Sequence, residues 1–359
     1  METTDDPADS GAYPAGADPP YLPSWIDRFT TWLERLPFPR WFCYLGLWLA
    51  LFLPYSGVKW WDGAYPFGTF NLFHLLLTGT SVYGLALMHY LDWSAGNALA
   101  AFRPVLTVDA KGYADLRYRL TTLPAWPTLW MSLLIGLWRG PSFLYHQDLF
   151  ASLKLGTSTL ALGLEIFFLC FLWAVAGAFV YHTFHQLRLV SQIYTSCTRI
   201  NLFQQGPLYA FSHLTARTAF GVLLLNGVWA MAETATGQPL VLLETTLFFT
   251  LIALVTFLWP LRSVHAILAA EQQRLQDETT HRLATTFVEL ERRLDAGDLE
   301  AVSTLKTAID SLRTKQEVIA NRPTWPWQRD TARGVGAAAA LPLVIWVIQR
   351  LLERFVFPS

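Results

Sequence analysis

Charged residues and cysteines are both scarce in this sequence. Only 15% of its 359 residues are Asp, Glu, Lys or Arg, and the formal net charge is −1. This balance offers no basic surface to a phosphate backbone, which argues against nucleic acid as a partner. The three cysteines, Cys43, Cys170 and Cys197, have neither metal-ligand nor disulfide-framework spacing, so the sequence implies no oxidising compartment.

Motifs for enzyme chemistry are also lacking. The sequence contains no glycine-rich phosphate-binding loop, no nucleophile elbow, no zinc-protease helix and no kinase signature. Its acidic start has neither the basic region nor the short apolar core of a cleaved signal peptide. We therefore expect neither an enzyme nor a cleaved leader, and we assign no catalytic residue.

Apolar residues dominate instead and make up 53% of the chain, with 16 Trp, 24 Phe and 13 Tyr. This composition is typical of membrane proteins, whose aromatic rings settle at the bilayer interfaces. Seven windows approach the roughly 20 apolar residues that cross the hydrocarbon core. They cover residues 41–55, 71–91, 123–138, 156–181, 218–235, 239–261 and 334–349. Because the third and the seventh are short, the count is six, seven or eight.

The predicted fold class is all-α, a polytopic membrane helix bundle of about seven spans with a cytoplasmic antiparallel helical hairpin. Lys and Arg are more frequent on the inner flanks when the N-terminus is placed inside, which predicts an N-inside and C-outside orientation. Six spans form a bundle over residues 41–261. The fourth helix continues past its span, so that residues 182–217 form a cytoplasmic extension.

The N-terminal segments differ from the bundle in composition. Residues 1–23 are rich in Asp, Pro, Gly and Ala, which predicts a disordered tail. Residues 24–38 have an apolar stripe at helical spacing, and Ser24 and Asp27 have the spacing of a capping box. We interpret this segment as an amphipathic helix in the membrane interface. The alternative is a soluble helix packed on a cytoplasmic domain.

A charged hairpin follows the sixth span. Residues 262–322 carry leucine-rich stripes close to a heptad, separated by a turn signal, Asp295-Ala-Gly297-Asp298. Packing between the two helices is sufficient to explain the stripes, and packing on neighbouring subunits is the alternative. Residues 323–359 form a Trp-rich linker and the last membrane span.

Glu165 lies well inside the fourth predicted span, about ten residues from its outer end. An ionised group there is costly, so its side chain is expected to be paired, hydrated or protonated. One interpretation is a cation or proton path approached from outside, with Asn226 as a polar neighbour and Glu244 nearer the outer surface. The other is a protonated Glu165 that bonds a Thr or Tyr on the next helix.

The last span combines small residues with a proline. Gly334 and Ala338, like Gly336 and Ala340, are four residues apart, which lets helix backbones approach closely. Pro342 removes a backbone donor and predicts a kink at the carbonyl of Ala338. Ala338 and Pro342 are therefore candidates for lining or gating a pathway, and plain helix packing is the alternative.

Several histidines fall at the predicted inner interface, among them His89, His182 and His185. His182 and His185 are three residues apart and share a helix face, a spacing compatible with metal or haem ligation. Histidine at an interface also has ordinary structural roles, and no carboxylate or cysteine completes a site. We assign no cofactor or metal.

Two stretches are similar to segments of uncharacterised bacterial multipass membrane proteins. They are Arg199-Ile-Asn-Leu-Phe with Pro207-Leu-Tyr-Ala-Phe-Ser, and Pro323-Thr-Trp-Pro-Trp327. The resemblance implies the bacterial inner membrane, and that family carries no activity to transfer. The predicted layout, in architecture only, also resembles the insect-type seven-helix chemoreceptor channels, which are tetramers whose last helix lines a cation pore.

These features lead to three functional hypotheses. The first is a homo-oligomeric channel-like or sensor protein of the lipid bilayer, with the last helix near the pathway. The second is a non-conducting signalling or scaffold protein whose cytoplasmic hairpin binds a soluble protein partner. The third is a haem- or metal-binding redox protein that uses the inner histidines.

Overall fold

The structure is a computed structural model that describes residues 19–141, 158–196, 209–234, 239–325 and 333–340, with Val344 and Val347. Within these ranges the chain is helical and has no β-strand. The helices are α1 (Trp25–Glu34), α2 (Arg40–Trp61), α3 (Leu72–Phe102), η1 (Arg103–Val105), α4 (Ala110–Thr121), α5 (Ala125–Arg139), α7 (Thr159–Ser196), α8 (Tyr209–Thr234), α9 (Pro239–Asp295) and α10 (Leu299–Ala320). Residues 333–340 are also helical. The predicted all-α class is confirmed.

Four of the described helices are long and apolar enough to cross a bilayer. They cover Arg40–Trp61, Leu72–Val105, Thr159–Thr195 and Ala253–Asp295. Helix α5 has 15 residues and is therefore shorter than the roughly 20 that a perpendicular crossing needs. The membrane class stands on four helices, while the count of seven spans and the N-inside orientation stay predictions.

Exposed tryptophans mark both ends of α2. Trp41 is 68% exposed and Trp61 is 92% exposed. Twenty residues of helix separate them, which is about 30 Å and matches the thickness of the hydrocarbon core. Tryptophan is enriched at the two membrane interfaces, so this spacing fits a helix that spans the bilayer.

Small residues let α5 and α7 pack closely along their length. A Cβ added to Gly177 would lie 2.5 Å from the carbonyl oxygen of Met131, and one added to Gly136 would lie 2.9 Å from that of Cys170. Gly140 is equally close to Cys170. Side chains at these three positions would separate the backbones, so the glycines fix the distance between the helices.

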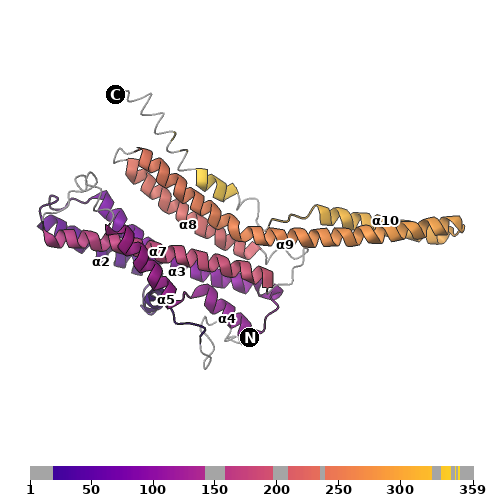
Figure 1. The fold of residues 1–359 in the computed structure, drawn as a ribbon, viewed down its shortest axis with the longest axis horizontal. Helices are drawn as coiled ribbons and strands as arrows, with labels where there is room; N and C mark the ends of the chain where they lie inside the picture. The colour runs from indigo at the N-terminus through magenta and orange to yellow at the C-terminus, as the bar shows by residue number, and fades with distance from the viewer. Residues whose placement is uncertain are drawn as a thin grey trace.

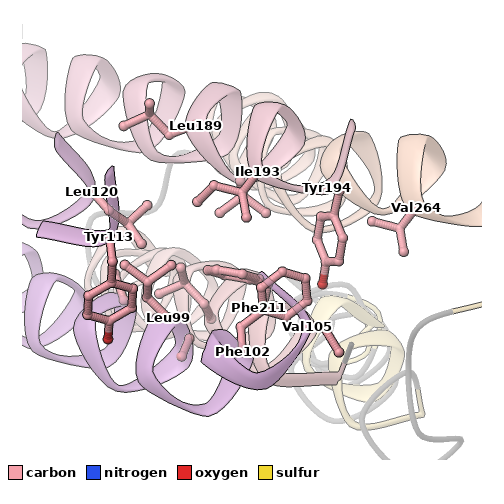
Figure 2. Packing of buried hydrophobic residues seen from close by; sticks show 14 of the residues in the cluster. Leu99, Phe102, Val105, Tyr113, Leu120, Leu189, Ile193, Tyr194, Phe211 and Val264 are labelled. Atoms are coloured by element: carbon pink, nitrogen blue, oxygen red, sulfur yellow. The ribbon is translucent and has the colours of Figure 1, made fainter. Parts of the chain in front are cut away.

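The largest buried cluster joins the ends of α3 and α7 to α4, the start of α8 and the middle of α9. In Figure 2 the rings of Phe102, Tyr194 and Phe211 meet at its centre, with Val264 of α9 beside them. The centroids of Phe102 and Tyr194 are 5.2 Å apart, and those of Phe102 and Phe211 are 5.1 Å apart. The cluster therefore connects the membrane helices to α9.

Beyond this cluster α9 runs on and pairs with α10. We call residues 262–320, the second half of α9 with the turn and α10, the arm; it projects from the bundle in Figure 1. The turn at 295–298 forms as predicted, with Gly297 at a φ of 75° and the Asp298 side chain accepting from the Ala301 amide at 3.2 Å. Gln272 donates to the carbonyl of Ile319 at 2.7 Å, which closes the arm near its base.

The close contact at Gly177 predicts that even alanine is too large there. Gly177→Ala is expected to lower the free energy of unfolding by about 1–3 kcal/mol, as overpacking does. Gly163 lies on the same helix, and a Cβ there meets no atom within 4 Å. Gly163→Ala is the matched control and is expected to be neutral or slightly stabilising. Unfolding in detergent micelles measures both, and an equal response of the two variants would contradict the packing argument.

Candidate functional site

An ion pair is buried where α2 and α7 meet, at the end of the bundle opposite to the arm. The Nζ atom of Lys59 lies 2.7 Å from Oε2 of Glu165, and both side chains are 1% exposed. Lys59 is near the last turn of α2 and Glu165 near the first turns of α7, so two helix ends bring the charges together. We call Tyr55, Lys59, His74 and Glu165 the ion-pair cluster.

Two further groups of the cluster converge on the same carboxylate oxygen. The hydroxyl of Tyr55, one helical turn before Lys59, donates to Oε2 of Glu165 at 2.5 Å. The Nε2 atom of His74, in the first turn of α3, lies 3.4 Å from that oxygen. Three helices therefore meet at one carboxylate, and each of them supplies a buried polar side chain.

Aromatic rings surround the charges. The ring of Tyr55 lies 4.7 Å from that of His74 and 4.8 Å from that of Phe168. In the loop between α2 and α3, Asn71 donates to the hydroxyl of Tyr65 at 2.9 Å, and the Tyr65 ring packs on His74. Burial raises the pKa of Tyr65, the Asn71 hydrogen bond opposes the shift, and the charge of Glu165 adds to it. The charge of Glu165 therefore affects the pKa of a side chain in this loop.

The cluster keeps unused hydrogen-bonding capacity. Among the described residues, Oε1 of Glu165 has no hydrogen-bond partner. Beyond their ion-pair contacts with Oε2, Nζ of Lys59 and Nε2 of His74 also make no hydrogen bond in this part of the chain. Buried polar groups are usually satisfied, and exceptions often mark sites that exchange a proton or a polar ligand. Oε1 of Glu165 is therefore a buried acceptor to which no described residue donates.

A second polar group lies between α3 and α7, farther along both helices. Asp92 of α3 lies 2.8 Å from Nε2 of His182 and accepts from Nε2 of Gln186 at 3.0 Å. His182 is seventeen residues beyond Glu165 on α7, which corresponds to about 25 Å. Helices α3 and α7 thus carry one polar group near their first turns and a second beyond their middle, and Leu85, Met88, Val175 and Ala178 are buried between the two groups.

The three predicted inner histidines have separate partners. Nε2 of His89 lies 2.9 Å from Glu34 and its Nδ1 lies 2.9 Å from the hydroxyl of Tyr44. His182 contacts Asp92, and Nε2 of His185 lies 3.0 Å from the carbonyl oxygen of Arg119. Within the described ranges, no group of three or more side chains that bind metals converges. His182 and His185 share a helix but not a site.

Asp27 ties the N-terminal helix to the bundle near this second polar group. Its Oδ2 accepts from the Ser24 amide at 3.0 Å, the Ser24 hydroxyl at 2.6 Å and the Leu123 amide at 3.0 Å. The predicted capping box of Ser24 and Asp27 is confirmed. Burial, helped by the charge of Asp92, raises the pKa of Asp27 to about 6 against the lowering effect of these hydrogen bonds.

The other sequence candidates lie on other helices or outside the described residues. Asn226 is buried on α8, which packs on α3 and α9. Ala338 is half-buried against the cluster that α8 and α9 form around Ala219 and Phe257. The side chain of Glu244 and the whole of Pro342 lie outside the described residues.

Sequence reasoning singled out Glu165 but missed its partners. Lys59 stands near the end of a predicted span, where the sequence favours a charge that faces water, whereas the structure buries it. One signal was available, because Tyr55 and Lys59 are four residues apart and therefore share a helix face at the end of an apolar run. His74 gave no such signal, since it stands alone at the start of the next helix.

Comparison with known proteins found no relative of this chain. The chain matches no protein family, no curated protein and no solved structure.

A double-mutant cycle tests the coupling in the ion pair. Glu165→Gln or Lys59→Met alone leaves a buried charge without its partner and is expected to lower the free energy of unfolding by about 3–5 kcal/mol. The double variant Lys59→Met/Glu165→Gln removes both charges and is expected to be far less destabilised than the sum of the two single variants. Unfolding in detergent micelles measures all four proteins. Additive losses would show that the two charges are not coupled.

Proposed function

We propose that this protein is a membrane sensor in which the Lys59–Glu165 pair receives the signal and the arm transmits it. The observation that carries the proposal is a fully buried ion pair held among apolar helices, whose second carboxylate oxygen has no hydrogen-bond partner among the described residues. Ionisable groups at such depth are costly and are usually retained for function. A proton or small cation that neutralises Glu165 removes the attraction that holds Lys59 in place.

Helix α7 provides a continuous connection from the ion pair to the arm. It runs without a break from Thr159 to Ser196, so about 43 Å of helix separate Glu165 from Tyr194. Tyr194 is buried in the cluster that also contains Val264 and Leu268 of α9. A rotation or shift of α7 at the ion pair is therefore passed to the base of the arm through packed side chains.

The signal has a physical basis in the cost of an unpaired buried charge. While Glu165 is ionised, the pair offsets part of the desolvation penalty of both groups. Once Glu165 is neutral, a Lys59 ammonium group at this position has no counter-ion, and hydrating it requires a movement of the helix end. The pair thus supports two arrangements of α2 and α7, and an input at Glu165 shifts their populations.

The arm is suited to contact another molecule. Val288 and Leu294 are exposed on α9 near the turn, and Leu299 at the start of α10 is 77% exposed. Its base is anchored by Trp325 of the following linker, whose ring stacks on His265 of α9 at 4.1 Å. An anchored base with exposed apolar residues at the tip fits an output element that docks a cytoplasmic protein or a second copy of the chain.

The sensor proposal predicts a change in the arm when the pair is broken. Glu165→Gln in lipid nanodiscs is expected to increase hydrogen exchange at the base of the arm, residues 262–275, by at least roughly tenfold. Lys59→Met/Glu165→Gln, which leaves no unpaired charge, is expected to exchange like the unaltered chain. Hydrogen–deuterium exchange with mass spectrometry gives both rates. Equal exchange in Glu165→Gln and the unaltered chain would refute the coupling.

A second candidate function is a homo-oligomeric channel with the last helix near its pathway. The helical residues 333–340 favour it, because Val335 and Ala339 are buried against α8 and α9 while Gly336, Ala337 and Ala340 are exposed. A face of such small residues lets the same helix of neighbouring copies approach closely.

The channel proposal predicts ion flux that depends on this face. Reconstituted protein is expected to carry cations across liposomes, and Gly336→Leu is expected to reduce the flux at least roughly tenfold by filling the contact. Gly163→Leu, at another position with no atom within 4 Å, is the control and is expected to conduct normally. Flux no greater than that of protein-free liposomes would refute this function.

A further inference from the structure

An open groove of about 300 Å³ lies along the exposed side of α1. It is lined by Pro23, Asp27, Arg28, Thr31, Trp32 and Arg35. Ile26 and Leu33, on the other side of the helix, are buried in the bundle. The helix is therefore held by its apolar face and presents the groove outward.

Within the described residues, two arginines of this groove have no partner for their charge. Arg28 and Arg35 are seven residues apart, which places them on the same side of α1 two turns from each other. In the part of the chain that the structure describes, neither guanidinium group makes a hydrogen bond or ion pair. The nearby carboxylate of Glu34 pairs with Arg40 and His89 instead.

Asp27, the one acidic residue that lines the groove, already accepts hydrogen bonds from the protein. Asp27 directs Oδ2 to Ser24 and to the amide of Leu123, and its side chain is buried. Two exposed cations therefore face one buried and hydrogen-bonded anion, and the groove has an excess of positive charge.

The groove also lies close in sequence to the start of α2, a helix long and apolar enough to span a membrane. Five residues, 35–39, lie between the end of α1 at Glu34 and the start of α2 at Arg40. Phe38, Trp41 and Phe42 at this junction are exposed aromatic residues, as is Trp32 within the groove. Exposed aromatics around the start of a spanning helix mark the interfacial region, where lipid headgroups lie.

We propose that this groove binds the headgroup of an anionic phospholipid, with its phosphate between Arg28 and Arg35 and its glycerol region against the Trp32 ring. Guanidinium groups bind phosphate oxygens through two parallel hydrogen bonds, which favours arginine at such sites. The exposed aromatic residues beside the groove supply the apolar contact that a lipid has and a free phosphate ion lacks. This site is independent of the sensor and channel proposals.

Lipid binding to the full-length protein in neutral detergent tests the site. Short-chain phosphatidylglycerol is expected to bind at least roughly tenfold more tightly than phosphatidylcholine of the same chain length, measured by native mass spectrometry. Arg28→Gln/Arg35→Gln is expected to lose this preference. Lys111→Gln/Lys306→Gln removes two exposed cations elsewhere, so it has the same net charge and is expected to keep the preference.

Three results would overturn the proposal. The two lipids bind the unaltered chain equally, the arginine variant retains the preference, or inorganic phosphate at the same concentration displaces the lipid. The last result would identify a site for soluble anions. Because the two arginine side chains are exposed, both variants are expected to unfold at the temperature of the unaltered chain, which the same samples verify.

Discussion

The constraint on which the structure depends is the burial of Lys59 and Glu165 among apolar helices. Neither charge is stable there alone, so α2 and α7 must keep the two atoms in contact. The Tyr55 hydroxyl of α2 and the His74 ring of α3 contact the same carboxylate, so α3 takes part in this constraint as well. The end of the bundle is thereby fixed by polar contacts, whereas lipid-facing helices alone have no hydrophobic force to choose their neighbours.

Small residues and a large apolar cluster fix the remaining contacts. Gly136 and Gly177 bring α5 and α7 together at backbone distance, so α7 has little freedom to move sideways along that contact. At its other end α7 enters the cluster of Phe102, Tyr194 and Phe211, which also holds α9. Two helices connect the ion-pair cluster to this second cluster, α3 from His74 to Phe102 and α7 from Glu165 to Tyr194.

Hydrogen bonds at the start of α1 tie the N-terminal helix to this bundle. The capping box of Ser24 and Asp27 begins α1, and the same carboxylate binds the amide of Leu123 before α5. With its buried face held in this way, α1 presents Trp32, Arg28 and Arg35 on its exposed side. The sequence signal for this helix was strong because a capping box and an apolar stripe are local features that need no distant partner.

Local features of this kind are what the sequence by itself determined: the all-α class, the capping box, the turn around Gly297 and the unusual position of Glu165. Helical periodicity reveals which residues share one face of one helix. It does not reveal which faces meet, because that choice depends on packing between segments far apart in the chain. Only the tertiary structure therefore paired Glu165 with Lys59, 106 positions earlier, and His182 with Asp92. The same physical reason separated His182 from His185, which are neighbours on a helix but face different partners.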